Sequence, residues 1–406
     1  MRVIIVNDFG YVEGGATAVA IETALQFKKA GIDVLYFCGK GPVAPELIDA
    51  GVKTVCLDME SILSDPNRIR AICLGINNAN VGKQLASLLR SYDPKDTVIH
   101  IHTWTKVLSS SIYDVVRDLK FPTFVTAHDY FLVCPNGGLY NYQTKKICRL
   151  EPMSKQCITC NCDRRSQMQK YWRCIRQAKQ NASIYSNKKI RYFAVSEYQK
   201  KILEHLLPKG TRCEVLRNPI ATIASPGTTP TKREKFVFLG RVVPEKGVDL
   251  FCEAVDRISA KGVVVGDGEL LEPLKERSPS IEFLGWRSKD DLDDVIEDAL
   301  ACVAPSRWHE TALLSPLEFM EHEVPCIVPD ECAASEYVVE GINGYIFKTG
   351  DVVSLAEKMS LMLEKPLIPE RPQFGSEDYL NILLDRYNRA LGDQETASCI
   401  PDGENF

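Results

Sequence analysis

The sequence of 406 residues contains no apolar segment long enough to cross a lipid bilayer as a helix. Its first apolar stretch, residues 1–6, leads directly into a polar loop instead of continuing as the hydrophobic part of a secretion signal. We therefore expect a cytoplasmic protein rather than a secreted or membrane-spanning one. With 45% hydrophobic and 25% charged residues, the composition is typical of a globular chain.

The Gly-x-Gly-x-x-Gly fingerprint of dinucleotide-binding domains is also missing from the first strand-to-helix turn. That turn carries Gly14-Gly15 instead, immediately before an expected helix. Without side chains at these positions, a phosphate or a sugar can approach the backbone amides. Gly14-Gly15 is therefore either a binding loop or only a device for the turn.

Cysteine, in contrast, is abundant. The chain has 15 cysteines, an odd number mostly placed in apolar strands, which favours a reducing compartment over a disulfide framework. Six of them fall within residues 134–174, and Cys157 and Cys160 have the Cys-x-x-Cys spacing of metal ligands. Cys148 and Cys162 complete a candidate structural zinc site, whereas the alternative is a set of reduced, buried thiols or labile disulfides.

Strand and helix patterns alternate through both halves of the chain, which predicts an α/β protein with doubly wound, mostly parallel sheets. The length favours two domains. The expected strands are residues 2–6, 33–37, 54–57, 97–101, 122–126, 191–195 and 213–216, then 236–239, 263–265, 281–284, 302–304, 326–328 and 344–347. The expected helices are 16–30, 67–91, 107–119, 168–178, 248–258, 269–277, 289–299 and 376–391. Residues 221–233, rich in Thr, Pro and Ser, form the expected linker.

Candidate site residues follow several of these strands, where ligands of such sheets gather. His128 follows the strand at 122–126 and can donate to a sugar hydroxyl or a phosphate, although a bond to the neighbouring loop is the simpler alternative. Arg241 and Lys246 lie five residues apart at a strand-to-helix turn, as expected for a grip on the two phosphates of a nucleotide.

Two carboxylates, Glu310 and Glu318, flank an expected helix start. Ser315 is the expected cap, Pro316 suits the first helical position, and Glu318 can complete a capping box. The free amides of such a helix end favour a diphosphate, and the Glu310 carboxylate can accept hydrogen bonds from sugar hydroxyls. An ordinary cap without a ligand is the alternative.

These motifs, together with Gly266-Asp-Gly268 and Glu340-Gly-Ile-Asn-Gly344, resemble glycosyltransferase family 4 in their order. The resemblance covers the whole chain. It implies a GT-B fold, in which two Rossmann-like domains face a cleft and a C-terminal helix crosses back to the first domain. The implied parts are an acceptor domain at 1–220 with a Cys-rich basic insertion at about 134–180, a donor-nucleotide domain at 234–365, and a helix with a polar tail at 366–406.

The resemblance also implies residue roles. His128, Arg241, Lys246 and Glu310 would be catalytic. The donor nucleotide would contact Gly15, Arg241, Lys246, Leu314, Ser315 and Glu318, and the acceptor would contact Gly14, Gly15 and His128. The family usually has Phe-Gly where this chain has Ala312-Leu313, so the shape of the sugar pocket, and with it the donor, is left open.

The expected reaction is a retaining transfer, without a cofactor or catalytic metal, from a nucleotide-diphosphate sugar to a saccharide acceptor. Paired carboxylates are also typical of glycosidases, but a hydrolase of neutral sugars would not need the Arg241/Lys246 grip. The alternatives left open are a nucleotide-sugar epimerase or a phosphorylase on the same fold, and a non-catalytic carbohydrate-binding relative.

The charge distribution bears on the acceptor. Residues 145–201 contain 15 Lys and Arg against three acidic residues, although the whole chain carries a net charge of -5. Met168, Tyr171, Trp172 and Ile175 share one face of a basic helix there, which fits an anionic membrane surface unless the face packs against the first domain. We therefore expect a lipid-linked saccharide or a growing cell-surface polysaccharide as acceptor, peripheral binding to the inner face of the plasma membrane, and no nucleic acid partner.

Overall fold

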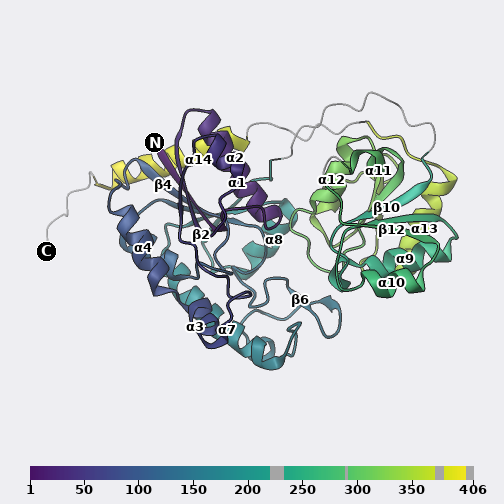
Figure 1. Ribbon diagram of the computed structural model, residues 1–406, viewed down its shortest axis with the longest axis horizontal. Helices are drawn as coiled ribbons and strands as arrows, with labels where there is room; N and C mark the ends of the chain where they lie inside the picture. The colour runs from purple at the N-terminus through teal and green to yellow at the C-terminus, as the bar shows by residue number, and fades with distance from the viewer. Residues whose placement is uncertain (220–232, 289–290, 371–378, 399–406) are drawn as a thin grey trace.

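The computed structural model of the protein describes residues 1–219, 233–288, 291–370 and 379–398. Two large sheets, each composed of parallel strands, form the cores of two α/β domains that lie side by side (Figure 1). Most of the linker expected at 221–233 lies outside the described residues. No helix of the described residues is both long and apolar enough to cross a membrane.

The first sheet has seven strands in the order β3-β2-β1-β4-β5-β8-β9. Their bounds are β1 Arg2–Phe9, β2 Asp33–Lys40, β3 Lys53–Cys56, β4 Thr97–Ile101, β5 Thr123–Ala127, β8 Arg191–Ala194 and β9 Arg212–Val215. The helices α1 (Gly15–Lys29), α2 (Pro45–Asp49), α3 (Arg68–Ile76), α4 (Ala79–Leu89), α5 (Ser111–Asp118) and α8 (Glu197–Leu206) accompany it. Almost every residue of β1, β2, β4 and β5 is buried, as expected for a parallel sheet covered on both faces.

Two expected helices of this domain are wrong in extent. The helix expected at 67–91 is two helices, α3 and α4, because the Asn78 side chain accepts a hydrogen bond from Val81 N and starts a new helix. The helix expected at 107–119 begins only at Ser111, because the Asp8 carboxylate accepts hydrogen bonds from the backbone N–H groups of Val107 and Leu108. Asn78 Nδ2 also donates to Val107 O over 3.3 Å, so partners distant in sequence contribute to both boundaries, and local periodicity does not show them.

The second sheet has six strands in the order β12-β11-β10-β13-β14-β15. They are β10 Lys235–Leu239, β11 Lys261–Val265, β12 Ile281–Gly285, β13 Ala299–Val303, β14 Cys326–Pro329 and β15 Gly344–Phe347. The accompanying helices are η1 (Pro244–Lys246), α9 (Val248–Arg257), α10 (Leu271–Arg277), α11 (Asp293–Glu297), α12 (Leu314–Glu321), η2 (Ala333–Tyr337) and α13 (Val352–Glu364). In place of the helix expected at 289–299, only the short α11 forms among the described residues.

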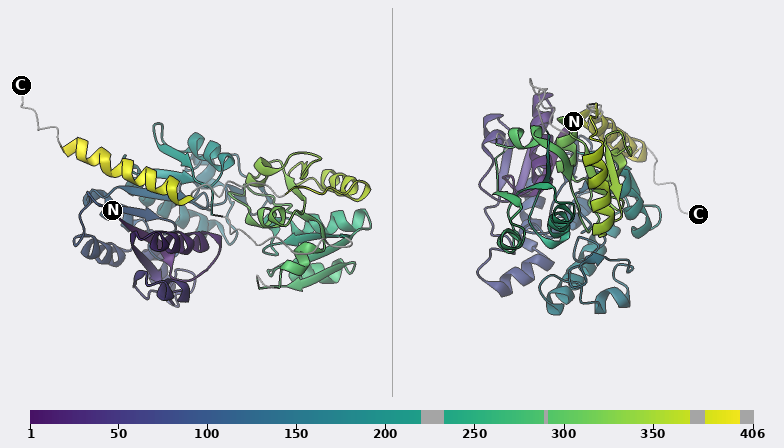
Figure 2. Two further views of the ribbon diagram at one scale, coloured as in Figure 1. Left: turned by 90° about the horizontal axis from the view of Figure 1, so that it is seen from above. Right: turned by 90° about the vertical axis from the view of Figure 1, so that its right-hand side faces the viewer.

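The C-terminal helix α14 (Tyr379–Ser398) crosses back to the first domain, as expected (Figures 1 and 2). Its Leu383, Tyr387 and Ala390 pack into the core formed by α1 and β2. The Tyr387 hydroxyl lies 2.6 Å from His100 Nδ1 on β4, and the Tyr379 hydroxyl lies 2.8 Å from Thr23 Oγ1 on α1. The last helix therefore completes the first domain although it follows the second in sequence.

The Cys-rich insertion forms a hairpin of β6 (Tyr140–Asn141) and β7 (Lys146–Ile147), the short α6 (Lys155–Thr159) and the long α7 (Gln167–Tyr185). The hairpin extends towards the second domain (Figure 1). Arg149 forms an ion pair with Glu331 of that domain. A Cβ added to Gly138 would lie 3.3 Å from the Trp308 ring, so the insertion also packs beside the loop that carries Glu310.

Helix α7 buries several polar side chains and exposes several apolar ones, which is the reverse of the usual arrangement in an amphipathic helix. It buries Lys170, Arg176 and Gln180, whereas Met168 is 74% and Ile175 58% exposed. The buried polar groups have partners: Gln180 accepts from Trp104 Nε1 and donates to Phe131 O. The alternative that the apolar stripe packs against the first domain is therefore wrong for Met168, Tyr171 and Ile175, which are all exposed.

Candidate functional site

The ion pair between Lys246 and Glu310 lies at the end of the second sheet. Lys246 ends η1 after β10, and Glu310 lies in the loop between β13 and α12. Lys246 Nζ donates to Glu310 Oε1 over 2.6 Å, and Ser306 Oγ donates to the same oxygen over 2.6 Å. Gly247 permits this approach, because a Cβ there would lie 1.9 Å from Pro305 O and the residue has a φ of 70°.

The Glu310 carboxyl is buried and ionised. Burial alone would raise its pKa, but the charge of Lys246 and the hydrogen bonds from Lys246 and Ser306 outweigh burial and hold the pKa below its ordinary value. An ionised carboxylate accepts hydrogen bonds only, so it can receive those of sugar hydroxyls. Its position beside an ammonium group brings a group that can bind sugar hydroxyls next to one that can bind phosphate.

Arg241 lies near this pair without bonding to it. Its guanidinium carbon is 6.0 Å from the centre of the Trp308 ring, and Lys246 Nζ is 5.5 Å from the same centre. Arg241 is more than half exposed, whereas Lys246 is mostly covered. The structure therefore brings Arg241 and Lys246 to one aromatic ring, and both can reach a diphosphate placed there.

The start of α12 differs from the expected cap. The helix begins at Leu314 and has no side-chain cap, so Ser315 and Glu318 both lie inside it and cannot form the expected capping box. The chain enters through Leu313, whose φ of 50° is in the left-handed region. That conformation explains why a glycine suits this position, and a leucine adopts it at a cost of about 1–3 kcal/mol.

Leu314, the first residue of α12, lies against the start of α1 in the first domain. A Cβ added to Gly15 at the start of α1 would lie 3.4 Å from Leu314 Cδ1, and Gly14 precedes Gly15 as the N-cap of α1. The Gly14-Gly15 turn and the start of α12 therefore face each other across the two domains. Gly15 and Leu314, which are both expected to contact the donor, are therefore neighbours, and their roles stay predictions.

His128 follows β5 and lies against the Glu310 loop. Thr311, the neighbour of Glu310, donates from Oγ1 to His128 O over 2.9 Å, and Ser196 Oγ donates to Thr311 O over 2.7 Å. His128 Nε2 lies 3.0 Å from His102 Nδ1, at the end of the adjacent strand β4. One of these nitrogens donates to the other, so His102 sets which nitrogen of His128 carries its proton.

A row of imidazoles continues from His128 into the first domain. The rings of His100 and His102 are 4.3 Å apart, and His100 Nε2 lies 2.7 Å from Thr126 Oγ1. Burial lowers the pKa of His128 to about 4 and that of His100 to about 3, so these rings are neutral at pH 7. When His102 Nδ1 is the donor in its contact with His128 Nε2, the single N–H of a neutral His128 is on Nδ1, where it can be donated to a sugar without adding charge.

Tyr198 and His309 form a contact between the domains that sequence reasoning missed. The hydroxyl of Tyr198, at the start of α8, lies 2.5 Å from Nδ1 of His309. His309 is the residue immediately before Glu310. Burial lowers the pKa of His309 to about 4. The only signal in the sequence was that His309 adjoins Glu310, which gave no indication of its partner.

The thiols of the insertion gather around a lysine. Lys170 has no exposed surface and donates from Nζ to Cys157 Sγ over 3.5 Å, while Asn141 and Asn136 donate side-chain N–H groups to Cys160 and Cys162. All cysteines among the described residues are free. Within the same residues no three Cys, His, Asp or Glu side chains are arranged to hold a metal ion, so the zinc site at Cys148, Cys157, Cys160 and Cys162 stays a prediction.

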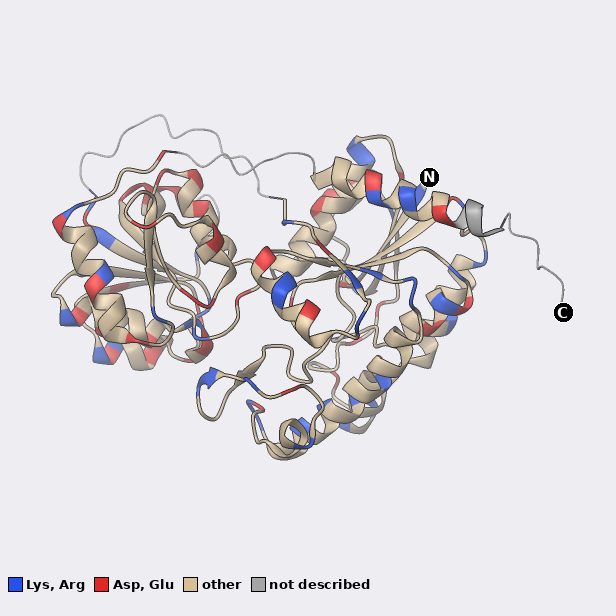
Figure 3. Ribbon diagram, turned by 180° about the vertical axis from the view of Figure 1, so that it is seen from behind, with Lys and Arg blue, Asp and Glu red and all other residues tan. Residues whose placement is uncertain are grey.

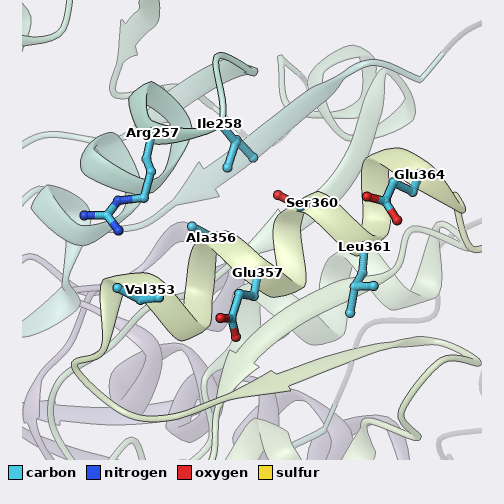
Figure 4. Close-up of a pocket in the computed structure, with 8 residues that line it drawn as sticks. All are labelled: Arg257, Ile258, Val353, Ala356, Glu357, Ser360, Leu361 and Glu364. Carbon is cyan, nitrogen blue, oxygen red and sulfur yellow. The ribbon is translucent and has the colours of Figure 1, made fainter.

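A surface groove of about 400 Å³ lies between α9 and α13 in the second domain (Figure 4). Its lining residues are Arg257, Ile258, Val353, Ala356, Glu357, Ser360, Leu361 and Glu364. None of the candidate residues lines it, and its two carboxylates would repel a diphosphate. The groove is therefore separate from the candidate site.

Comparison with known families and sequences agrees with this geometry. Residues 220–379, which include Arg241, Lys246, Glu310 and Glu318, match the family model of the glycosyl transferases group 1. An uncharacterized glycosyltransferase of Methanocaldococcus jannaschii is 29% identical over 128 residues, 30% of this chain and 36% of that protein. A GDP-mannose-dependent alpha-mannosyltransferase of Corynebacterium glutamicum is 29% identical over 136 residues, 33% of this chain and 32% of that protein. The matches thus span about a third of these relatives' length.

The fold is similar to that of solved glycosyltransferase structures over almost the whole chain. HepE of Anabaena, solved in complex with UDP-glucose, has a TM-score of 0.63 at 14% identity, covering 98% of this chain and 100% of that chain. The expected GT-B fold is therefore confirmed. The expected resemblance to the glycosyltransferases is confirmed as well, at the level of the group 1 family model.

Proposed function

We propose that this chain, whose second domain matches the group 1 glycosyl transferases, is a retaining glycosyltransferase that moves a sugar from a nucleotide-diphosphate sugar to a saccharide acceptor. The observation that carries the proposal is the Lys246–Glu310 ion pair beside Arg241, in a loop that also contacts His128 of the first domain. This arrangement offers cations for a diphosphate and a carboxylate for the attached sugar. The retaining outcome rests on the family resemblance.

Charge stabilisation supplies the proposed rate enhancement. When the bond between the anomeric carbon and the diphosphate oxygen breaks, both electrons leave with the diphosphate, and its charge grows towards Arg241 and Lys246. Cations that are in place before the reaction stabilise this transition state more than the bound donor. The acceptor hydroxyl then forms the new bond to the anomeric carbon and gives its proton to the departing diphosphate oxygen, so no nucleophile from the protein is required.

We propose that no metal ion or other cofactor is needed, because Arg241 and Lys246 take the role that a divalent ion plays for other diphosphates.

The other candidate residues have proposed roles around the donor and the acceptor. Glu310 would hold the donor sugar hydroxyls, and Ser315, Leu314 and Glu318 would lie along the nucleotide at α12. His128, neutral through burial, would donate to the reacting sugar. Gly14 and Gly15 leave room for the acceptor at the start of α1.

The surface of the first domain favours a lipid-linked acceptor. The apolar side chains of α7 adjoin those of α3, since Trp172 Nε1 donates to Ile72 O over 3.0 Å. We define the α3/α7 patch by its exposed large apolar residues, Ile69, Ile72, Met168, Tyr171 and Ile175. Ile69 is 78% exposed, and so large a group of exposed apolar side chains is unusual for a protein that contacts only water.

The charges beside this patch favour an anionic membrane as its occupant. Neither α3 nor α7 contains an acidic residue (Figure 3 colours Asp and Glu red), whereas the exposed Arg68 begins α3 and the exposed Arg165 lies just before α7. An apolar surface bordered by cations is typical of proteins that rest on anionic lipid. We therefore propose peripheral binding to the inner face of the plasma membrane, where a lipid-linked saccharide or a growing polysaccharide presents its sugar to the cleft.

A thermal-shift screen of nucleoside diphosphates, followed by their sugars, identifies the donor. Transfer is then measured as nucleoside diphosphate released and labelled sugar attached to an added saccharide. An epimerase would change the labelled donor without an acceptor, and a phosphorylase would require inorganic phosphate. Absence of any turnover with every donor that stabilises the protein would contradict the transferase and favour a non-catalytic carbohydrate-binding protein.

A further inference from the structure

Arg164 belongs to the first domain, and its guanidinium group lies against the second domain. It lies in the insertion between Cys162 and α7, and its NH2 nitrogen is 2.6 Å from Glu269 Oε2 of the second domain. Its NH1 nitrogen is 3.9 Å from Glu245 Oε1. The residue expected only to add positive charge to a membrane face therefore points at the candidate nucleotide site.

Glu245 connects Arg164 to the phosphate grip. It immediately precedes Lys246, and its side chain is only 2% exposed. Arg241 NH2 lies 3.7 Å from the same Oε1 atom that Arg164 approaches, and the other oxygen of Glu245 has no hydrogen-bond partner. The buried Glu245 carboxylate thus lies within 4 Å of two guanidinium groups, those of Arg164 from the first domain and Arg241 from the second. It forms a short hydrogen bond to neither.

We propose that Arg164 is a third cation for the donor diphosphate, delivered across the cleft by the insertion. This inference rests on the proposed function, since it assigns a further ligand to the same site. A guanidinium group binds phosphate oxygens in pairs, which makes it well suited to bridge the diphosphate. Glu269 holds Arg164 near that position before the donor arrives.

The present partner of Arg164 does not prevent this role. Arg164 and Glu269 are both more than two-fifths exposed, and ion pairs between exposed side chains contribute little to stability. A diphosphate with more negative charge than one carboxylate can displace Glu269. Gly138 beside Trp308 and the Arg149–Glu331 pair keep the insertion docked while Arg164 changes partner.

The role is tested by the affinity for the nucleoside diphosphate that the screen identifies and for its monophosphate, measured by calorimetry. Arg164→Ala is expected to weaken diphosphate binding about tenfold or more and monophosphate binding less than threefold, the usual size for one charge-assisted bond. Lys155→Ala, at an exposed lysine of the same insertion, is the matched control and should bind like wild type. Unchanged diphosphate affinity in Arg164→Ala would overturn the inference.

Glu269→Gln separates a phosphate ligand from a simple latch between the domains. It should bind the diphosphate as tightly as wild type or more tightly, because it removes only the competing carboxylate. If Glu269→Gln weakens binding as much as Arg164→Ala, the pair is a latch and the inference is wrong. If Arg241→Ala loses the diphosphate while Arg164→Ala keeps it, the inference fails but the proposed function stands. If wild type binds no nucleoside diphosphate, both fail.

Discussion

Lys246 and Glu310, 64 residues apart in sequence, form a 2.6 Å ion pair at the end of the second sheet. The two residues are proposed to hold different parts of the donor, the diphosphate and the sugar. Their direct contact means that the bond between those parts lies beside both side chains when the donor binds. Each residue also neutralises the other in a place where an unpaired charge would be costly.

Glu310→Gln should lose at least 99% of transfer activity while still binding the bare nucleoside diphosphate. The amide keeps the size of the side chain but not the charge that the sugar hydroxyls and Lys246 require. Turnover and calorimetric affinity measure the two effects separately. Glu282→Gln, at an exposed carboxylate of the same domain that pairs with Lys235, is the control. Loss of nucleotide binding in Glu310→Gln would assign Glu310 another role.

Much of the fold was predictable because alternation of apolar strands and amphipathic helices is a local signal. The strand at 97–101 and the crossing C-terminal helix were both expected, and both are present. The break at Asn78 involves Val107, and the late start of α5 depends on Asp8, and both partners are distant in sequence. Local periodicity contains no information about such partners.

The contacts among the candidate site residues could not be predicted from the sequence, and the roles of these residues stay predictions. Motif order predicted that Lys246 and Glu310 lie near a ligand, but only the fold shows that they pair with each other. The cap at Ser315 was wrong because Leu313 takes a left-handed conformation that local propensity disfavours. Arg164 entered the sequence analysis only as one of the 15 Lys and Arg within residues 145–201, and nothing local to it indicated Glu245.

The α3/α7 patch should bind liposomes that contain anionic lipid and should bind neutral ones weakly. Replacing Ile69, Met168 and Ile175 by Ser removes apolar area that the membrane would bury, so co-sedimentation should fall several-fold at low salt. Ile342→Ser, at an exposed isoleucine of the second domain, is the control.

Charge removal in the same assay should be made at Arg68 and Arg165. Lys170 is fully buried and Arg173 pairs with the buried Asp163, so neither is free to contact lipid. The double Ala variant should lower binding, and added salt should do the same. Equal co-sedimentation of wild type and both variants, with full transfer to a soluble saccharide, would contradict the membrane proposal and leave the transferase proposal intact.

Cys157→Ala should lower folding yield and the thermal midpoint more than it lowers donor binding. The Cys157 thiol accepts from the fully buried Lys170 and alanine has no acceptor atom, so the substitution leaves an ammonium group less well paired, at a cost of about 1–3 kcal/mol. Cys73→Ala, at an exposed cysteine, is the control. Elemental analysis of the purified protein checks the zinc prediction, and about one zinc per chain would confirm it.

The free energy of unfolding should fall as the pH is lowered from 7.5 to 5.5. Burial lowers the pKa of His100, His102, His128 and His309 below 6.5, so below that pH the unfolded chain binds protons at imidazoles that stay neutral in the folded chain. Burial raises the pKa of Asp129 to about 6 and also raises that of Asp8, which opposes the effect with fewer protons. Urea titrations measure the change, and constant or increasing stability towards pH 5.5 would contradict it.

The most direct test of the proposed function is label transfer by Lys246→Ala at saturating donor. Lys246 is proposed to stabilise the departing diphosphate, so its loss should reduce turnover by two or more orders of magnitude. Lys261→Ala, at an exposed lysine that pairs with Glu234, is the matched control, and thermal midpoints of both variants establish that they are folded. The account predicts that wild type and Lys261→Ala attach labelled sugar to the acceptor at similar rates, while folded Lys246→Ala transfers at least 100-fold more slowly. A near wild-type rate in Lys246→Ala would contradict it.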